Sequence, residues 1–389
     1  MSVVFFSSSK HLVEFDWMLP IIIEYSKKEN VVLVCSNTYS FENVFFKKYD
    51  FVKKVNLKII YKDDIYPFLN ILRNITHNLK IFNFFSRTLN YFVSYDILKQ
   101  TCNNANLIFA SNYPTSTKRN LENLFYLYSK KSKGLFIGTP IVPWVHWYQS
   151  YIYDFDYFLC SSTLEFLALQ KMANKLNILF LGCPSFDSKY LKLYDEIGLK
   201  KSYKQKKITL LFIMVNTLNP IYSGFDIYED LFNCVKKLEL KGFYVIIKLH
   251  PTSYHYDFSK LKKMGISAEN FTTDSIEKLN TRVDIAVTYF STSILKCVAR
   301  NIHSYVYLPL KLLDSFPKYE NSIFLDLYFK ENDINRSRFE DVCIRITNIN
   351  EINFTKANTN LHLNFNSLFC SNNSIYKIVN YLELIKKIK

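Results

Sequence analysis

Glycine is scarce in this sequence, with 7 residues in 389, and no apolar run approaches the ~18–20 residues that a membrane-spanning helix requires. The first residues, MSVVFFSSSKH, lack the charged segment and long apolar core of a signal peptide. The 8 cysteines are widely spaced and form no C-x-x-C pair, which argues against a disulfide framework and a zinc site. We therefore expect a cytoplasmic protein whose cysteines are buried, reduced thiols.

Apolar residues (49%) and basic residues are abundant. The 49 Lys and Arg outnumber the 34 Asp and Glu and give a net charge of +15, which favours polyanionic partners. The basic residues are scattered and form no RNP, zinc-finger or helix-turn-helix pattern, so nucleic acid is not expected as a partner. This charge agrees better with a phosphorylated donor, with a lipid-linked acceptor, or with peripheral binding to the anionic inner face of a membrane.

Short apolar runs alternate with longer amphipathic segments along the chain. The runs are continuous and rich in β-branched and aromatic residues, as parallel strands buried on both faces are. Two series of strands are predicted, at 3–6, 31–35, 57–60, 107–110, 135–137, 157–160 and 178–181, and at 208–214, 243–249, 285–289 and 304–308. Helical patterns occur at 15–27, 119–131, 164–175, 227–240 and 292–300. This alternation predicts an α/β fold with parallel sheets.

The polar, basic stretch Tyr194–Lys207 divides the chain into two halves, each with its own series of strands and helices. We expect two Rossmann-like domains facing each other across a cleft, which is the GT-B architecture. Residues 1–195 would form the acceptor-side domain and residues 205–389 the nucleotide-donor domain, with ligands at the carboxyl ends of the strands. Asn348–Asn373 is Asn-rich and is predicted to be a loop, whereas Ser374–Lys389 is predicted to be a helix.

The sharpest motif is KLHP, which follows the strand pattern FYVIIKL. Pro251 prevents the strand from continuing, so His250 is expected to project from its carboxyl end, where it could donate to a diphosphate or stabilise a leaving nucleotide. Lys248 alternates with His250 and is expected on the same side. A lone histidine at a strand end is often structural, but this setting favours a catalytic role for His250 and donor binding by Lys248 and Pro251.

A second motif, Ser291-Thr292-Ser293, follows a predicted strand and precedes a predicted helix. Backbone N–H groups and the dipole at a helix amino end favour anions, and hydroxyls can add hydrogen bonds to phosphate oxygens. One hydroxyl would be enough for ordinary helix capping. Three in a row indicate a second donor-binding turn.

The predicted strands of the first half also end in turns that carry glycine or serine. Gly138 and Thr139 follow GLFI and are candidate acceptor-side residues. Gly182 follows ILFL and begins the turn GCPSFD, which makes it a candidate donor-binding residue.

In their order and spacing these segments resemble the CDP-glycerol glycerophosphotransferase-like family of teichoic-acid and capsule synthesis. The matching segments are IGTP (137–140), DYFLCSS (156–162), GCPSFD (182–187), KLHP (248–251) and DIAVTYFSTS (284–293). The resemblance implies that His250 and the Ser291–Ser293 turn hold the phosphates of the donor. Bacterial sialyltransferases also pair an H-P motif with a Ser/Thr motif, so the resemblance favours a cytidine nucleotide, CDP- or CMP-linked.

The chain departs from the family at Ile137, where the family has a histidine that is thought to be catalytic. His146, in PWVHWYQ, is an alternative, although it could equally pack between its tryptophan neighbours. His11, Glu14 and Asp16 follow the first predicted strand, where a base could reach an acceptor hydroxyl. His11 and His146 are therefore candidate catalytic residues, and Glu14 and Asp16 are candidate acceptor-side residues.

No metal and no cofactor are expected. Asp154-Phe155-Asp156 resembles the D-x-D of metal-dependent transferases, but it precedes its strand, and a metal-binding pair belongs where a strand ends. The predicted function is transfer of a sugar or polyol phosphate from a nucleotide-activated donor to a bacterial surface glycan such as capsule, teichoic acid or lipooligosaccharide. A nucleotide-sugar 2-epimerase and a non-catalytic glycan-assembly protein are the alternatives.

Overall fold

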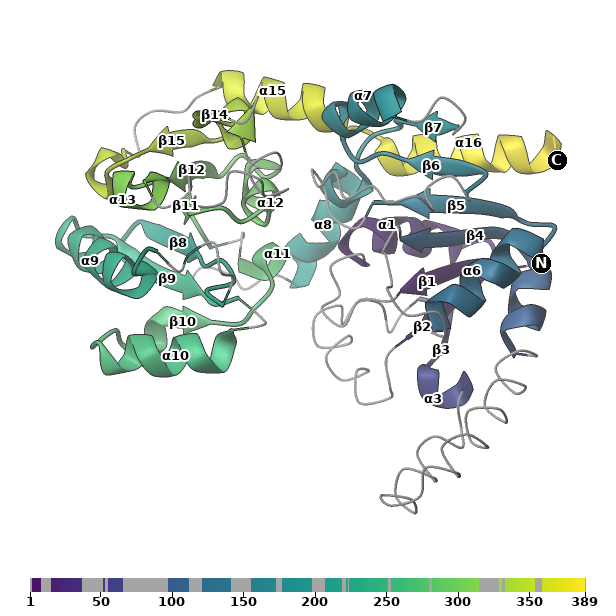
Figure 1. Cartoon of the computed structure of the whole chain (residues 1–389), viewed down its shortest axis with the longest axis horizontal. Coiled ribbons are helices and arrows are strands. Elements are labelled where there is room, and N and C mark those ends of the chain that lie inside the picture. Colours follow the sequence, from purple (N-terminus) through teal and green to yellow (C-terminus); the bar gives the residue numbers. More distant parts are fainter. Residues whose placement is uncertain are drawn as a thin grey trace, which may run out of the picture. The chain divides into compact units, whose positions relative to one another are not determined.

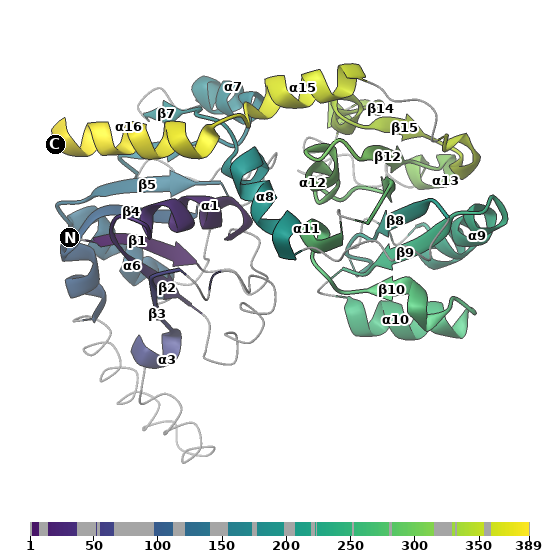
Figure 2. The same cartoon turned by 180° about the vertical axis from the view of Figure 1, so that it is seen from behind.

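The computed structural model of the protein describes residues 2–7, 15–36, 52, 55–65, 97–111, 121–140, 155–172, 177–197, 207–218, 222, 224–250, 253–279, 282–314, 329–330, 333–353 and 359–388. Its contacts separate two compact units. Unit 1 comprises Met1–Tyr190 and Phe369–Lys389, and unit 2 comprises Leu191–Leu368. Figures 1 and 2 show the elements of both from opposite sides.

Unit 1 is built on a seven-stranded parallel sheet with the order β3-β2-β1-β4-β5-β6-β7. Its strands are β1 (Ser2–Ser7), β2 (Asn30–Cys35), β3 (Leu57–Ile60), β4 (Ala105–Ser111), β5 (Leu135–Thr139), β6 (Tyr157–Leu159) and β7 (Ile178–Leu179). Its helices include α1 (Phe15–Tyr25), α3 (Lys62–Ile65), α6 (Leu121–Lys131), α7 (Thr163–Met172) and α16 (Ser374–Ile388).

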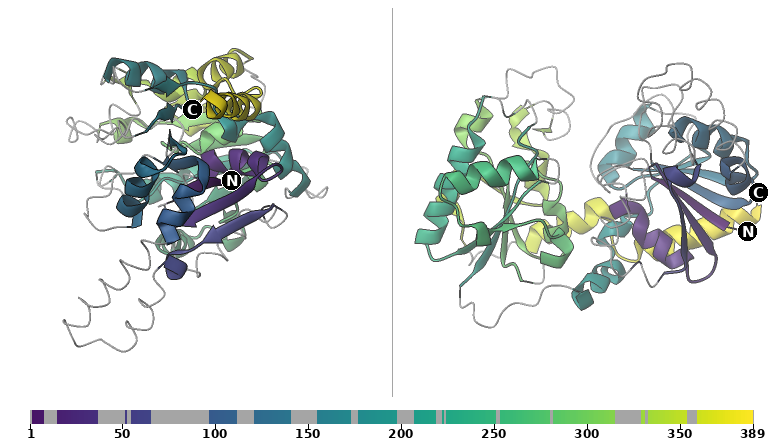
Figure 3. Two further views of the ribbon diagram at one scale, coloured as in Figure 1. Left: turned by 90° about the vertical axis from the view of Figure 1, so that its right-hand side faces the viewer. Right: turned by 90° about the horizontal axis from the view of Figure 1, so that it is seen from below.

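The core of unit 1 has two layers, because successive side chains of a strand point to opposite faces of the sheet. On one face, the ring of Phe6 stacks on Phe125 of α6 at a centroid distance of 4.4 Å. On the other face, Phe5 stacks on Phe109 of β4 at 4.5 Å, and Tyr25 of α1 covers Phe109. Figure 3 shows α1 and α16 together on one side of this sheet and α6 on the other.

Unit 2 is built on a six-stranded parallel sheet with the order β10-β9-β8-β11-β12-β15. Its strands are β8 (Thr209–Ile213), β9 (Tyr244–Lys248), β10 (Phe271–Thr272), β11 (Ile285–Thr288), β12 (His303–Tyr307) and β15 (Ile344–Ile346), with β13 (Phe329–Lys330) and β14 (Asp333–Ser337) in a separate pair. Its helices include α9 (Ile227–Leu240), α10 (Tyr254–Lys263), α11 (Ile276–Leu279), α12 (Ile294–Val298), α13 (Leu310–Leu313) and α15 (Thr359–Phe369).

The α/β fold with two parallel sheets is confirmed, and each predicted strand has a counterpart in the structure. The edge strands β10 and β15 escape prediction because neither lies in a continuous apolar run: polar residues flank β10, and β15 contains Arg345. The prediction of a loop over Asn348–Asn373 is wrong in part, since α15 lies within it. The helix predicted at the C-terminus is confirmed as α16.

The unit boundary falls inside α8 (Ser188–Ile197), earlier than the predicted boundary at 195–205. Arg300 explains this, because its guanidinium donates to the Asp195 carboxylate and to the Leu191 carbonyl and so ties the second half of α8 to unit 2. The second difference concerns α16. The sequence predicts it as part of the second domain, 205–389, and in the structure it belongs to unit 1. There α16 packs against α1 and buries residues such as Ile378 and Leu382.

The environment of the cysteines agrees with the sequence analysis. All eight are free, and seven of them are buried. Burial raises the pKa of the Cys102 and Cys183 thiols to about 12, so both stay protonated near neutral pH. Within the described ranges, no helix combines the length and the apolar character that a membrane span needs.

Candidate functional site

The two motifs of the second half meet at the carboxyl edge of the unit 2 sheet. Strand β8 lies between β9 and β11, and its last residue, Ile213, is in register with Lys248 on one side and Thr288 on the other. Neighbouring strands lie ~4.8 Å apart, so the KLHP turn and the Ser291–Ser293 turn begin roughly 10 Å from each other. One phosphorylated ligand can contact both turns at this spacing.

The KLHP segment continues the alternation of β9 beyond the strand. Leu249 is buried at 1% exposure, whereas Lys248 and His250 on either side of it are partly exposed. This pattern places the Lys248 and His250 side chains on the same side of the strand, as expected. The chain then turns, and the N–H of Ser253 donates to the carbonyl of His250 at 3.2 Å. Pro251 lies outside the described residues.

The Ser291–Ser293 turn is less helical than predicted. The following helix, α12, has five residues instead of the nine expected, so its dipole contributes little to anion binding. The Ser291 N–H donates to Thr288 Oγ1 at 3.1 Å, and the Ser293 N–H donates to Ser291 Oγ at 3.4 Å. All three side chains of the turn are partly exposed, so its hydroxyls remain the candidate groups for phosphate.

A buried carboxylate that the sequence analysis missed joins the loops of this edge. Asp257, in the first turn of α10, is fully buried and accepts hydrogen bonds from Ser253 Oγ (2.5 Å), Thr217 Oγ1 (2.6 Å) and the Tyr228 hydroxyl (2.7 Å). Thr217 lies in the loop after β8, and Ser253 follows the KLHP turn. Asp257 therefore fixes two of the loops that surround the candidate site. The local sequence shows its bond to the nearby Ser253 at most, because the other two partners, Thr217 and Tyr228, are distant in the chain.

A second carboxylate lies beneath the same edge. Asp230 of α9 accepts from the Tyr289 hydroxyl at 2.8 Å and from the Tyr307 hydroxyl at 3.2 Å. Burial raises the pKa of Asp230, and the two tyrosine hydrogen bonds oppose that shift. Burial also raises the pKa of Tyr289. These three residues anchor α9 to β11 and β12.

The carboxyl edge of the unit 1 sheet carries small hydroxyl residues on three neighbouring strands. Ser7 ends β1, Ser111 ends β4 and Thr139 ends β5, and all three are buried. Ser111 and Thr139 are in register, and among the residues that the structure describes the hydroxyl of Thr139 has no hydrogen-bond partner. An unpartnered buried hydroxyl costs about 1–3 kcal/mol, so this edge is a candidate place for a bound hydroxyl or water.

The neighbours of Thr139 in the IGTP segment are explained by packing. A Cβ at Gly138 would lie 2.5 Å from the ring of Phe158 and 2.6 Å from that of Phe155, so only glycine fits between them. Ile137 is fully buried in the core of β5. The position where the family has a histidine therefore has no access to solvent here.

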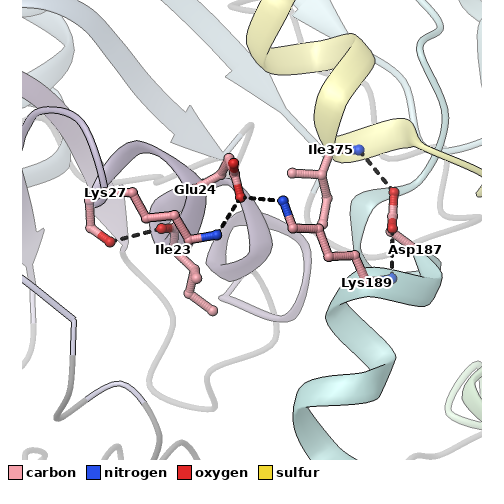
Figure 4. Close-up of polar contacts among 7 residues, drawn as sticks. Ile23, Glu24, Lys27, Asp187, Lys189 and Ile375 are labelled. Atoms are coloured by element: carbon pink, nitrogen blue, oxygen red, sulfur yellow. Dashed lines mark hydrogen bonds and ion pairs between the residues drawn. The ribbon is translucent and has the colours of Figure 1, made fainter.

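The GCPSFD turn attaches the C-terminal segment to unit 1. Gly182 has a φ of +101°, and a Cβ there would lie 2.3 Å from the carbonyl oxygen of Cys370. Asp187 accepts from the N–H of Lys189 at 2.9 Å and from the N–H of Ile375 at 3.1 Å, and thus caps the amino ends of α8 and α16 together (Figure 4). Ser374 Oγ adds a third hydrogen bond to this carboxylate. Since Gly182 is covered by the C-terminal segment, we leave it out of the donor site.

Two aspartates of the motif series hold strands together at their amino ends. Asp156 exchanges hydrogen bonds with Phe136, whose N–H donates to the Asp156 carboxylate at 2.8 Å. Asp284 does the same with Thr209, whose N–H donates to the Asp284 carboxylate at 2.9 Å. Asp156, the second acidic residue of the D-x-D pattern, therefore has a structural role.

The serines of DYFLCSS form a helix cap. Glu165 of α7 is buried and accepts from the backbone N–H and the hydroxyl of Ser161, and the Glu165 N–H donates to Ser162 Oγ at 3.2 Å. This arrangement is a variant of the capping box, in which a glutamate three residues into the helix reaches back to its start. The spacing Ser162-x-x-Glu165 is the sequence signal that predicts it.

The remaining candidates lie in unit 1. His11, Glu14 and His146 are outside the described residues. Asp16 lies in the first turn of α1, which follows β1, and is partly buried. Among the residues that the structure describes, no group of three His, Cys, Asp or Glu side chains is arranged to hold a metal ion.

No protein-family model and no curated protein matches the chain. Solved structures do resemble it. UDP-GlcNAc 2-epimerase from Methanocaldococcus jannaschii has a TM-score of 0.55 and 11% identity and covers 98% of this chain and 100% of its own. UDP-N-acetylglucosamine 2-epimerase from Rickettsia bellii also has a TM-score of 0.55 and 11% identity, with 99% and 98% covered.

The wall teichoic acid polymerase TagF, in a structure obtained after a soak with CDPG, has a TM-score of 0.52 and 12% identity over 99% of this chain and 88% of its own. At identities this low the likeness concerns the fold alone. Together with the two parallel sheets, it establishes the GT-B type of two-domain α/β fold.

Proposed function

We propose that the protein transfers a sugar or a polyol phosphate from a nucleotide-activated donor to a bacterial surface glycan. The observation that carries the proposal is the pairing of the KLHP and Ser291–Ser293 turns on either side of β8. In an open parallel sheet, ligands bind at the carboxyl ends of the strands, which is where both turns lie. Unit 2 is thus the proposed donor-binding domain and unit 1 the acceptor-side domain.

The charges of the donor edge suit a nucleotide phosphate. Lys248 supplies an ammonium group, His250 supplies a ring N–H, and the Ser291–Ser293 turn supplies hydroxyl donors, all partly exposed. Asp257 is fully buried and engaged by three hydroxyls, so it holds the surrounding loops without presenting its charge to the donor. A cytidine nucleotide is favoured because the motif order resembles that of the CDP-glycerol-dependent family, and because TagF, with its CDPG ligand, shares the fold.

The proposed reaction needs a hydrogen-bond donor at the leaving phosphate and a base at the acceptor hydroxyl. The acceptor hydroxyl attacks the donor, the bond to the nucleotide phosphate breaks, and the nucleotide leaves with both electrons of that bond. His250 stabilises the charge that develops on the leaving phosphate by donating a hydrogen bond. A base on the acceptor side removes the proton of the attacking hydroxyl, and His11, His146, Glu14 and Asp16 are the candidates. Gly138 and Thr139, at the end of β5, are the proposed acceptor-side residues.

Nucleotide binding tests the donor site directly. Replacing His250 with Ala should weaken binding of CDP at least tenfold in a calorimetric titration, because it removes a hydrogen-bond donor to charged oxygen. His255→Ala is the matched control, since His255 is an exposed residue of α10 outside both turns. CDP affinity that is the same in wild type and His250→Ala, or no affinity for CDP, CMP or UDP at all, would refute the donor site.

A nucleotide-sugar 2-epimerase is the second candidate function. Two epimerases share this fold over nearly the whole chain, which favours it. The serine–threonine turn without glycine argues against it, since epimerases normally carry Ser-Gly-Gly at the phosphate site. Incubation with UDP-N-acetylglucosamine alone separates the two functions, because an epimerase converts its substrate without an acceptor.

The third possibility is a glycan-assembly protein without catalytic activity. The burial of Ile137 at the position of the family histidine supports it. Turnover of a CDP- or CMP-linked donor, released as free nucleotide in the presence of a glycan or lipid-linked acceptor, would exclude this possibility. We also propose that the protein acts in the cytoplasm, bound peripherally to the anionic inner face of the membrane.

A further inference from the structure

A polar pocket lies at the opposite end of the unit 1 sheet, at the amino ends of its strands. Its volume is about 430 Å³, within the span of roughly 300–1,000 Å³ that is usual for ligand sites. Every described residue that lines it is polar. The lining residues are Ser26, Lys27, Lys28, Glu29, Asn30, Asn56, Asn106 and Lys386.

The topology of the sheet explains why these groups meet. Asn56 precedes β3, Asn30 begins β2 and Asn106 lies at the start of β4, so the three amides stand along one edge of the sheet. The order β3-β2-β1-β4 separates the outer two by three strand spacings, roughly 14 Å. The pocket is therefore an elongated trough lined with amide donors and acceptors. The turn after α1 and the last part of α16 supply its lysines.

Lysines supply the positive charge of the trough. Three lysines and one glutamate line it, and Glu24 and Glu383 outside the lining also pair with Lys27 and Lys386, which leaves Lys28 as the lining lysine without an ion pair among the described residues. Lys386 is engaged with Glu29 at 2.6 Å, and Lys27 with Glu24 at 2.8 Å. Lys28 is exposed at the rim of the trough, and an ammonium group has three donors, so Lys27 and Lys28 retain N–H groups for a ligand. Such a site binds an anion whose remaining groups exchange hydrogen bonds with amides.

We propose that this trough is a second ligand site of the chain, which takes a phosphate ester that also carries hydroxyl groups. The phosphate lies against Lys27 and Lys28, and the hydroxyls bond to the asparagines. It is distinct from the donor edge, which lies at carboxyl ends of strands in unit 2. A soluble polyol phosphate and the headgroup of phosphatidylglycerol both carry a phosphate ester with hydroxyl groups. The experiment below distinguishes these two sources of the ligand.

The test uses the full-length chain with two probes, sn-glycerol 3-phosphate and vesicles of phosphatidylglycerol, with phosphatidylcholine vesicles as the neutral comparison. The test variant combines Lys28→Glu with Asn56→Asp, two exposed lining residues. The control combines Lys263→Glu on α10 with Asn233→Asp on α9, which makes the same change in charge at exposed positions of unit 2. Calorimetry measures the soluble ester, and co-sedimentation measures the vesicles.

We expect the test variant to bind at least tenfold more weakly and the control to bind within twofold of wild type. Loss with the soluble ester identifies a free polyol phosphate as the ligand, and loss confined to anionic vesicles identifies the lipid headgroup. Equal binding by wild type and the test variant, equal losses in test and control, or no binding of either probe overturns the proposal. Because Lys28 and Asn56 belong to unit 1 and lie in neither of the two turns of the donor edge, CDP affinity should stay unchanged in the test variant. Failure here therefore leaves the proposed function untouched.

Discussion

Asp187 offers a sharp test of how the C-terminal segment stabilises unit 1. Its carboxylate caps α8 through the Lys189 N–H and α16 through the Ile375 N–H, and it also accepts from Ser374 Oγ. Replacing it with Ala removes one cap worth about 1 kcal/mol and two further hydrogen bonds to a buried charge worth together about 2–3 kcal/mol. We therefore expect unit 1 to lose about 3–4 kcal/mol of its free energy of unfolding.

The placement of the tryptophans makes this loss measurable for one unit alone. All three, Trp17, Trp144 and Trp147, belong to residues 1–190, so tryptophan fluorescence reports on unit 1. For a domain of 150–250 residues a loss of 1 kcal/mol lowers the melting temperature by about 2–4 °C, so Asp187→Ala should lower the fluorescence transition by roughly 6–16 °C.

Asp226→Ala is the matched control for Asp187. Asp226 caps one helix, α9 of unit 2, through the N–H groups of Tyr228 and Glu229 at 3.1 Å each. Its replacement should cost about 1 kcal/mol and leave the fluorescence transition where it is in wild type. A fluorescence transition in Asp187→Ala within about 2 °C of wild type would show that the double cap does not stabilise unit 1 as argued.

Three further predictions concern the backbone and the buried carboxylates. Gly182→Ala should destabilise unit 1 by at least about 2 kcal/mol in the fluorescence assay, because the new Cβ meets the carbonyl of Cys370. Gly242→Ala is the comparison: its φ is +85°, and no described atom lies within 4 Å of the Cβ position, so it should cost only about 1 kcal/mol, measured by circular dichroism. The pKa of Asp230 is raised above its ordinary value of 3.8 in the folded state, so the contribution of this group to the stability of unit 2 is lost as the pH rises above 3.8. Asp230→Asn should flatten that decline in urea unfolding curves. Asp257→Ala removes the acceptor of three hydroxyls, of which those of Ser253 and Tyr228 are buried, and should weaken CDP binding as well as lower the helix transition measured by circular dichroism.

The sheets could be predicted from the sequence because their signal is local. Continuous runs such as 208–214 and 243–249 have the composition of strands buried on both faces, and β8 and β9 lie within them. The position of KLHP and Ser291–Ser293 at strand ends follows from the same patterns. Their adjacency required the strand order, which sequence spacing does not supply.

The remaining features depend on contacts between distant segments. Asp257 accepts hydrogen bonds from Thr217 and Tyr228, which are 40 and 29 residues away in the chain, and Asp187 caps a helix that begins at residue 374. No periodicity or motif in the sequence around Asp257 or Asp187 predicts these pairings. Gly182 is an example, since its place at a strand end favours close approach of a ligand, and the structure shows the carbonyl of Cys370 packed against it.

The interruption of unit 1 by unit 2 has a consequence for synthesis on the ribosome. Unit 2 is one continuous segment, Leu191–Leu368, whereas unit 1 needs residues from both ends of the chain. At about 5–20 residues per second, a nascent chain takes roughly 10–35 s to pass through unit 2. During that interval the apolar face of α1 that receives α16 has no cover, and Asp187 has no second helix to cap. The middle of the chain can therefore finish folding before its beginning does.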